Sequence, residues 1–107
     1  MTNQSNIKSF HLNNCSFLKL SDIISTSVSY YILDIDNNID NIRDGKSSVS
    51  FPYISRVEDN KFQCLFKTED HLHNIKVTFN NNSFNIDYCY LNPNIVNKIN
   101  DIIKSKL

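Results

Sequence analysis

The chain has 107 residues, 40% of them hydrophobic, which is enough for one small domain with its own core. Lys plus Arg and Asp plus Glu both number 11, so the net charge is zero and the basic excess of most nucleic-acid binders is missing. No apolar run approaches the ~20 residues of a membrane span, and the N-terminus lacks the basic start and apolar core of a signal peptide. We therefore expect a single cytoplasmic domain over residues 1–107, with residues 1–5 disordered and with neither nucleic acid nor membrane as a partner.

The first half of the chain contains two strand-like segments with an ambiguous stretch between them. Residues 7–12 and 26–35 fit strands, and apolar side chains occupy both alternating faces of the second segment. Because a strand that is apolar on both faces is typical of a sheet interior, residues 26–35 are expected to form a central strand. Residues 16–25 fit either a short helix or a strand and turn, and we favour the helix.

Four alternating segments in the second half predict an antiparallel meander, at residues 48–57, 61–68, 75–79 and 83–90. In the first of them Val49, Phe51 and Tyr53 share the apolar face. Pro52 cannot donate a backbone hydrogen bond to a neighbouring strand, so this strand is expected at an edge or with a bulge. The second face of the meander is polar and could be left open to water; it carries Lys61, Gln63, Lys67, Lys76, Thr78, Asn85 and Asp87.

The C-terminus has the pattern of an amphipathic helix. Asn92 suits the N-cap, and Pro93 suits the first helical position, where its missing N–H is not needed. The apolar residues that follow lie on one stripe: Ile95, Val96, Ile99, Ile102 and Ile103. The fold class expected from these patterns is α+β, with an antiparallel β-meander sheet of five to seven strands and this helix packed on one face.

No catalytic or metal-binding constellation emerges from the sequence. Cys15, Cys64 and Cys89 are odd in number and widely spaced, so they predict free thiols in a reducing cytoplasm. His71 and His73 fall in the expected hairpin connector, residues 69–74, where no third ligand is assured. With one glycine there is no phosphate-cradling loop. We predict no metal and no cofactor.

The acidic segment 34–44, DIDNNIDNIRD, follows directly on an apolar run. Asp34, Asp36 and Asn38 match the first three ligand positions of an EF-hand calcium loop. Ile39 and Gly45 fail the two most demanding positions, which require glycine and a bidentate carboxylate. Three interpretations remain open: a calcium loop, a solvated turn, or a docking surface.

On the docking interpretation, the predicted contact residues are Asp34, Asp36, Asp40 and Asp44. Asp34 and Asp36 would leave the predicted strand at alternate positions, with their side chains pointing the same way. An exposed acidic field of this kind steers a basic partner during encounter.

Segment 30–44, YYILDIDNNIDNIRD, occurs in a small chain whose abundant Asn, Ile, Lys and Ser suggest an AT-rich genome. In these features the chain resembles the small bacterial immunity proteins that neutralise toxins, including those of contact-dependent inhibition systems. The resemblance implies a non-enzymatic protein that forms a one-to-one complex with a basic toxin domain and blocks a nuclease active site. The alternative is a small-ligand or lipid carrier with a pocket between helix and sheet; an enzyme is disfavoured by the missing constellation.

Overall fold

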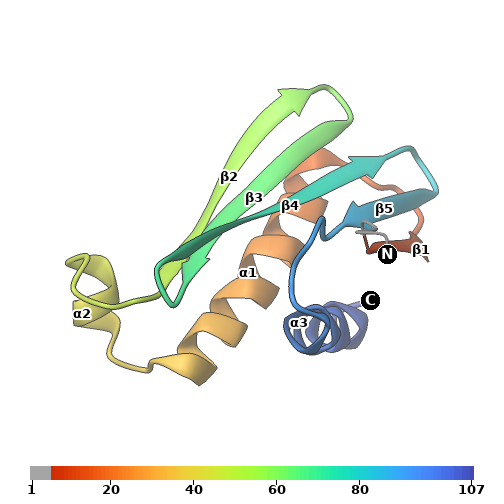
Figure 1. Ribbon diagram of the computed structural model, residues 1–107. Helices are drawn as coiled ribbons and strands as arrows, with labels where there is room; N and C mark the ends of the chain where they lie inside the picture. Colours follow the sequence, from red (N-terminus) through yellow and green to blue (C-terminus); the bar gives the residue numbers. More distant parts are fainter. Residues whose placement is uncertain (1–5) are drawn as a thin grey trace.

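An antiparallel sheet of five strands, with helices on one face, organises the chain (Figure 1). The computed structural model describes residues 6–107, so the expectation of disorder in residues 1–5 lies outside the described residues. The elements in chain order are β1 (Ile7–His11), α1 (Phe17–Ile35), α2 (Ile39–Arg43), β2 (Ser50–Glu58), β3 (Lys61–Thr68), β4 (His71–Phe79), β5 (Ser83–Asp87) and α3 (Pro93–Ser105).

The strand order is β1-β5-β4-β3-β2, so β2 to β5 form the predicted meander and β1 joins it beside β5. β2 is an edge strand, and its pairing with β3 shifts register between Ser50 and Tyr53, around Pro52. A proline that cannot donate to the ladder is tolerated at such a site, which confirms the expectation of an edge or a bulge. The α+β fold class and the C-terminal helix are confirmed as well.

The prediction of a central strand at residues 26–35 is wrong. These residues form the second half of α1, a helix of 19 residues that packs on β2 and β3. Ser16 caps its start, where the Ser16 hydroxyl accepts a hydrogen bond from the Lys19 backbone N–H at 3.2 Å. Its buried residues recur with the helical period: Leu20, Ile24, Ser27, Val28, Tyr31 and Ile32. Packing of this stripe overrides the strand propensity of the local sequence.

Helix α3 begins as predicted, because the Asn92 side chain accepts from the Asn94 backbone N–H at 2.8 Å. Ile99 and Ile103 are fully buried, and α3 lies beside α1 on the same side of the sheet (Figure 1). The core between helices and sheet is filled by large side chains that are at most 1% exposed, including Leu20, Ile24, Phe62, Phe66, Ile75, Phe84, Ile86 and Tyr88.

The hairpin between β3 and β4 is tighter than the sequence indicates. The predicted connector, residues 69–74, is wrong, because only Glu69 and Asp70 separate the two strands. Both residues adopt positive φ angles, 49° and 64°. Asn-Gly is the usual signature of a two-residue hairpin turn with this geometry, and the Glu-Asp sequence lacks that signature. The two histidines therefore lie in β4 and not in a connector.

Candidate functional site

The acidic segment is a folded helical turn. Asn38 caps α2, since its side chain accepts from the Asn41 backbone N–H at 3.1 Å. At the other end Gly45 has φ of 74°, and its N–H donates to the Ile42 carbonyl at 3.2 Å, while the Lys46 N–H donates to the Asn41 carbonyl at 2.9 Å. These two bonds form a Schellman motif, in which the left-handed residue is usually glycine. The glycine that fails the calcium pattern thus serves as the stop of α2.

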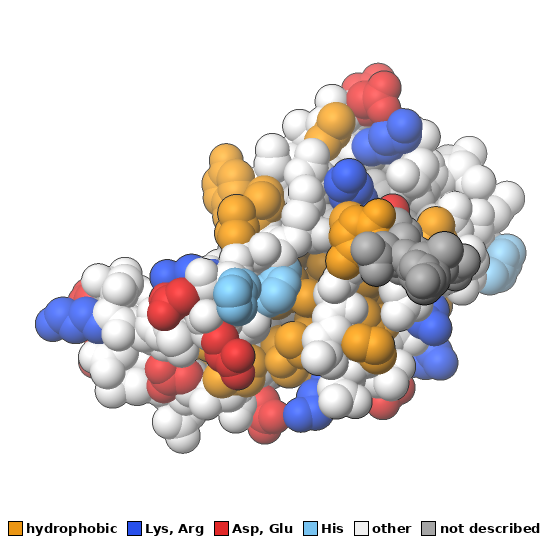
Figure 2. Space-filling model, in the orientation of Figure 1, with side chains coloured by type: hydrophobic (Ala, Val, Ile, Leu, Met, Phe, Trp, Pro, Cys, Tyr) orange, Lys and Arg blue, Asp and Glu red, His pale blue; other side chains and the backbone are white. Residues whose placement is uncertain are grey.

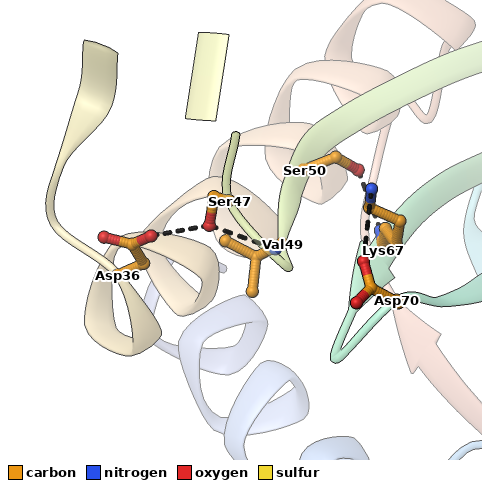
Figure 3. A network of polar contacts seen from close by, with 6 residues as sticks. All are labelled: Asp36, Ser47, Val49, Ser50, Lys67 and Asp70. Carbon is orange, nitrogen blue, oxygen red and sulfur yellow. Dashed lines mark hydrogen bonds and ion pairs between the residues drawn. The ribbon is translucent and has the colours of Figure 1, made fainter. Parts of the chain in front are cut away.

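Asp36 holds this segment to the residues that lead into β2. Its carboxylate accepts from the Ser47 hydroxyl at 2.6 Å (Figure 3). It also accepts from the Asn38 backbone N–H at 3.0 Å. These hydrogen bonds, the Ser47 bond first, lower the pKa of the Asp36 carboxyl below its usual value. The predicted common direction of Asp34 and Asp36 along a strand is wrong, because Asp34 lies in the last turn of α1 and Asp36 is its C-cap. Of the four predicted contact residues, Asp36 is therefore committed to local structure.

The other three predicted contact residues, Asp34, Asp40 and Asp44, are exposed. The turn between β3 and β4 lies beside them, because the Asp70 N–H donates to the Ser48 carbonyl at 3.0 Å. Acidic side chains gather on the side of the molecule that carries α2 (Figure 2). We call this region the acidic end; it comprises Asp34, Asp36, Asp40, Asp44, Glu69 and Asp70, together with the cations Arg43, Lys46 and Lys67.

The structure joins Glu69 and Asp70 to the acidic end through the tight β3–β4 turn. The sequence placed them only in the expected connector, residues 69–74. Asp70 forms an ion pair with Lys67 at 3.7 Å, and the Lys67 backbone N–H donates to the Ser50 hydroxyl at 2.9 Å (Figure 3). Since the whole chain is neutral, the excess of acidic over basic groups at this end leaves an excess of basic groups elsewhere. The molecule is thus electrically polarised although its net charge is zero.

The sheet face turned away from the helices has no helix of residues 6–107 covering it (Figure 1). It carries the polar residues expected there, but it also carries Tyr53 and Leu72, whose exposed fractions are 68% and 70%. Tyr53 pairs with Leu65 on β3, and Leu72 is a diagonal neighbour of Leu65 on β4. We call Tyr53, Leu65 and Leu72 the apolar patch.

Sequence reasoning missed the apolar patch for a structural reason. Tyr53 was expected on the inner face with Phe51, but the register shift around Pro52 turns it outward and turns Ile54, the partner of buried Cys64, inward. Leu72 was assigned to the predicted connector, residues 69–74, and therefore to no face of the sheet. The patch adjoins the acidic end, because Leu72 pairs with Lys67, which contacts Asp70. The expected bulge at Pro52 was the one signal in the sequence that residues after it could switch between the inner and the outer face of the sheet.

The two histidines share the helix side of β4. A hydrogen bond of 2.6 Å joins His73 Nε2 to Thr68 Oγ1, and the His73 ring lies 5.2 Å from that of Phe66. Burial, and secondarily His71, lowers the pKa of His73 below its usual value. Within residues 6–107, no three His, Cys, Asp or Glu side chains come together as a metal site would require. That the protein needs no metal stays a prediction.

The cysteines lie apart as thiols, and each has a raised pKa. Burial raises the pKa of Cys64 to about 12. Burial is also the first cause of the raised pKa values of Cys15 and Cys89. A thiol with a raised pKa is a poor nucleophile at neutral pH, because little thiolate forms. None of the three offers an activated nucleophile.

Comparisons with family models, curated proteins and solved structures found no match to this chain. None of the helices between residues 6 and 107 combines the length and apolar character needed to cross a membrane.

Proposed function

We propose that this chain is a non-enzymatic protein-binding domain whose partner docks on the apolar patch and the adjoining acidic end. The observation that carries the proposal is the position of Tyr53 and Leu72, which are largely exposed on a sheet face that no helix of residues 6–107 covers. Leu72 pairs with Lys67, which contacts Asp70 of the acidic end. Tyrosine is enriched among the few residues that supply most of the energy at protein interfaces, and contiguous exposed apolar side chains mark such surfaces. Carboxylates at the rim guide a basic partner and fix its orientation.

The alternative, a carrier for a small ligand or lipid, would need a chamber between the helices and the sheet. Phe62, Phe66, Ile75 and Ile86 occupy this space and are at most 1% exposed. Interiors packed in this way resist the insertion of further groups. This observation favours binding at the outer surface over binding in the core.

The finer proposal is that the chain is a cytoplasmic immunity protein that has no cofactor and blocks a basic toxin domain. Its support is the acidic end, because a carboxylate-rich surface is complementary to the basic surface with which a nuclease holds nucleic acid. An immunity gene lies directly beside the gene of its toxin. Co-expression with the neighbouring gene product should protect cells from its toxicity; continued killing would contradict the finer proposal while leaving protein binding open.

The broader proposal is tested by retention of a partner from a lysate of the source organism. The double variant Tyr53→Ala/Leu72→Ala should lose the partner that the wild-type chain retains. The control is Leu18→Ala, which removes a side chain that is 79% exposed on α1, away from the outer sheet face. A partner that binds wild type, control and patch variant equally would overturn the proposal.

A further inference from the structure

A cleft of about 450 Å³ opens between the end of α1, the β3–β4 turn and the start of α3. Its lining includes Tyr31, Ile35, Glu69, His73 and Ile95. Figure 2 shows histidine, acidic and hydrophobic side chains close together on this side of the molecule. The cleft lies on the helix side of the sheet and is separate from the apolar patch.

Tyr31 is the unusual member of this lining. It is only 6% exposed, yet its hydroxyl has no hydrogen-bond partner among the described residues. Among residues 6–107, Asn74 Oδ1 is the one side-chain atom that is both fully enclosed and unpartnered, so the Tyr31 hydroxyl reaches solvent. Tyr31 lines this cleft and also a neighbouring hollow that contains Asp34 and Lys98. A phenol hydroxyl that reaches solvent can accept a hydrogen bond from a group that enters the cleft.

Glu69 is the one carboxylate of the cleft lining, which also contains His71 and His73. Burial raises the pKa of Tyr31 first, and the carboxylates of Glu69 and Asp34 raise it further. No Lys or Arg belongs to the lining. His73 does not offset these charges at neutral pH, because its pKa is lowered and its ring is uncharged.

The start of α3 also borders the cleft, which raises the question of an anion site. Pro93 has no N–H, and the Asn94 N–H is taken by the Asn92 side chain. Two of the donors with which a helix start would hold an anion are therefore absent or occupied. Together with Glu69, this arrangement disfavours an anion and favours a cation.

We propose that the cleft binds the guanidinium group of an arginine, with Glu69 as its carboxylate partner and the Tyr31 hydroxyl as a further acceptor. A planar guanidinium forms paired hydrogen bonds with a carboxylate, and it stacks on aromatic rings better than an ammonium does. Ile35 and Ile95 offer apolar surface to the methylene stem. This inference rests on the proposed function in one respect: the basic partner would supply the arginine.

The test needs no knowledge of the partner. The probe is the peptide acetyl-Gly-Arg-Gly-amide, titrated by NMR, with the citrulline peptide as an uncharged ligand of the same shape. The arginine peptide should shift signals of Tyr31 and His73, and the citrulline peptide should not. Glu69→Gln and Tyr31→Phe should each weaken binding roughly threefold to tenfold, the range of a partly exposed charge-assisted hydrogen bond.

Asp59→Asn is the matched control, because it removes an exposed carboxylate from the turn between β2 and β3, and it should bind like wild type. Equal binding of both peptides, no binding at tens of millimolar, or full binding by Glu69→Gln would overturn the inference. The Tyr53→Ala/Leu72→Ala variant separates this failure from that of the proposed function. If it loses the partner while the arginine peptide fails to bind, the proposed function stands and the arginine site falls. If this variant keeps the partner while the arginine peptide binds as expected, the arginine site stands and the proposed function falls.

Discussion

Helix α2 and the β3–β4 turn lie side by side at the acidic end, but their sequences suit their backbones very differently. In the α2 segment Asn38 caps the helix and Gly45 takes the left-handed position that ends it. In the turn, Glu69 and Asp70 take left-handed positions that favour asparagine and glycine. Residues other than glycine, asparagine and aspartate are less stable in that conformation by about 1–2 kcal/mol, so the cost falls mainly on Glu69.

The comparison separates residues that the fold itself requires from residues that it does not require. The polar residues of the α2 segment close its helix and bind Ser47, so they have a structural reason to be present. The turn gains little from its side chains, since the Lys67–Asp70 pair is long and Asp70 is 78% exposed. Residues that break a local rule without a compensating contact are candidates for function. Glu69, which faces the cleft, is the clearest case.

The largest expected effect is at the anchor of α2. Ile42 is 5% exposed and is the one buried residue of this helix. Ile42→Ala should lower the free energy of unfolding by about 2–4 kcal/mol, as for other buried Ile→Ala changes. Urea unfolding measures this, with Leu72→Ala as the exposed comparison within about 0.5 kcal/mol of wild type. Equal stabilities of the two variants would show that α2 is not anchored in the core.

A smaller effect is expected at the end of α2. Nothing lies within 4 Å of a Cβ added to Gly45, so the φ of 74° alone sets the cost of Gly45→Ala. The free energy of unfolding should fall by about 1 kcal/mol. In the same urea experiment, a variant as stable as wild type would argue against the left-handed helix stop.

The smallest effect concerns pH. The pKa of Asp36 is lowered in the folded state, so its hydrogen bonds stabilise the fold above the ordinary carboxyl pKa and are lost as the pH falls through the folded value. Asp36→Asn should therefore be less stable than wild type at neutral pH, and the difference should shrink below about pH 4. Melting temperatures from pH 7 to pH 2 report this. A difference that stays constant would assign the effect to something other than the charge.

The sequence was sufficient for the parts of the fold where period and terminal signals agree. Residues 61–68 alternate and form β3, and Asn92-Pro93 begins α3 as expected. It misled at α1, because exposed Tyr30 and Ile35 and half-buried Leu33 blur the helical stripe and imitate a strand that is apolar on both faces. Ser16 and the recurrence of buried residues from Leu20 onward could have identified the helix.

The candidate sites were less predictable than the fold, because each depends on register. The reversal of Tyr53 arises from a bulge whose presence Pro52 indicates but whose position it does not set. The cleft depends on the Glu69–Asp70 turn, which has no turn signature, and on bringing Tyr31 of α1 beside it. The acidic residues were visible in the sequence. Only the hydrogen bond from Ser47 shows that Asp36 stabilises local structure, while the exposed carboxylates stay available for contacts.

The double variant Glu69→Asn/Asp70→Gly tests most directly whether the charges of the turn are kept for recognition at the expense of stability. Because both new residues suit positive φ, the free energy of unfolding should rise by about 1–2 kcal/mol, or roughly 4–8 °C in Tm per kcal/mol. Binding of the arginine peptide should fall as it does for Glu69→Gln. A variant that is no more stable than wild type would contradict the strain, and one that binds the peptide as well as wild type would contradict the role in recognition.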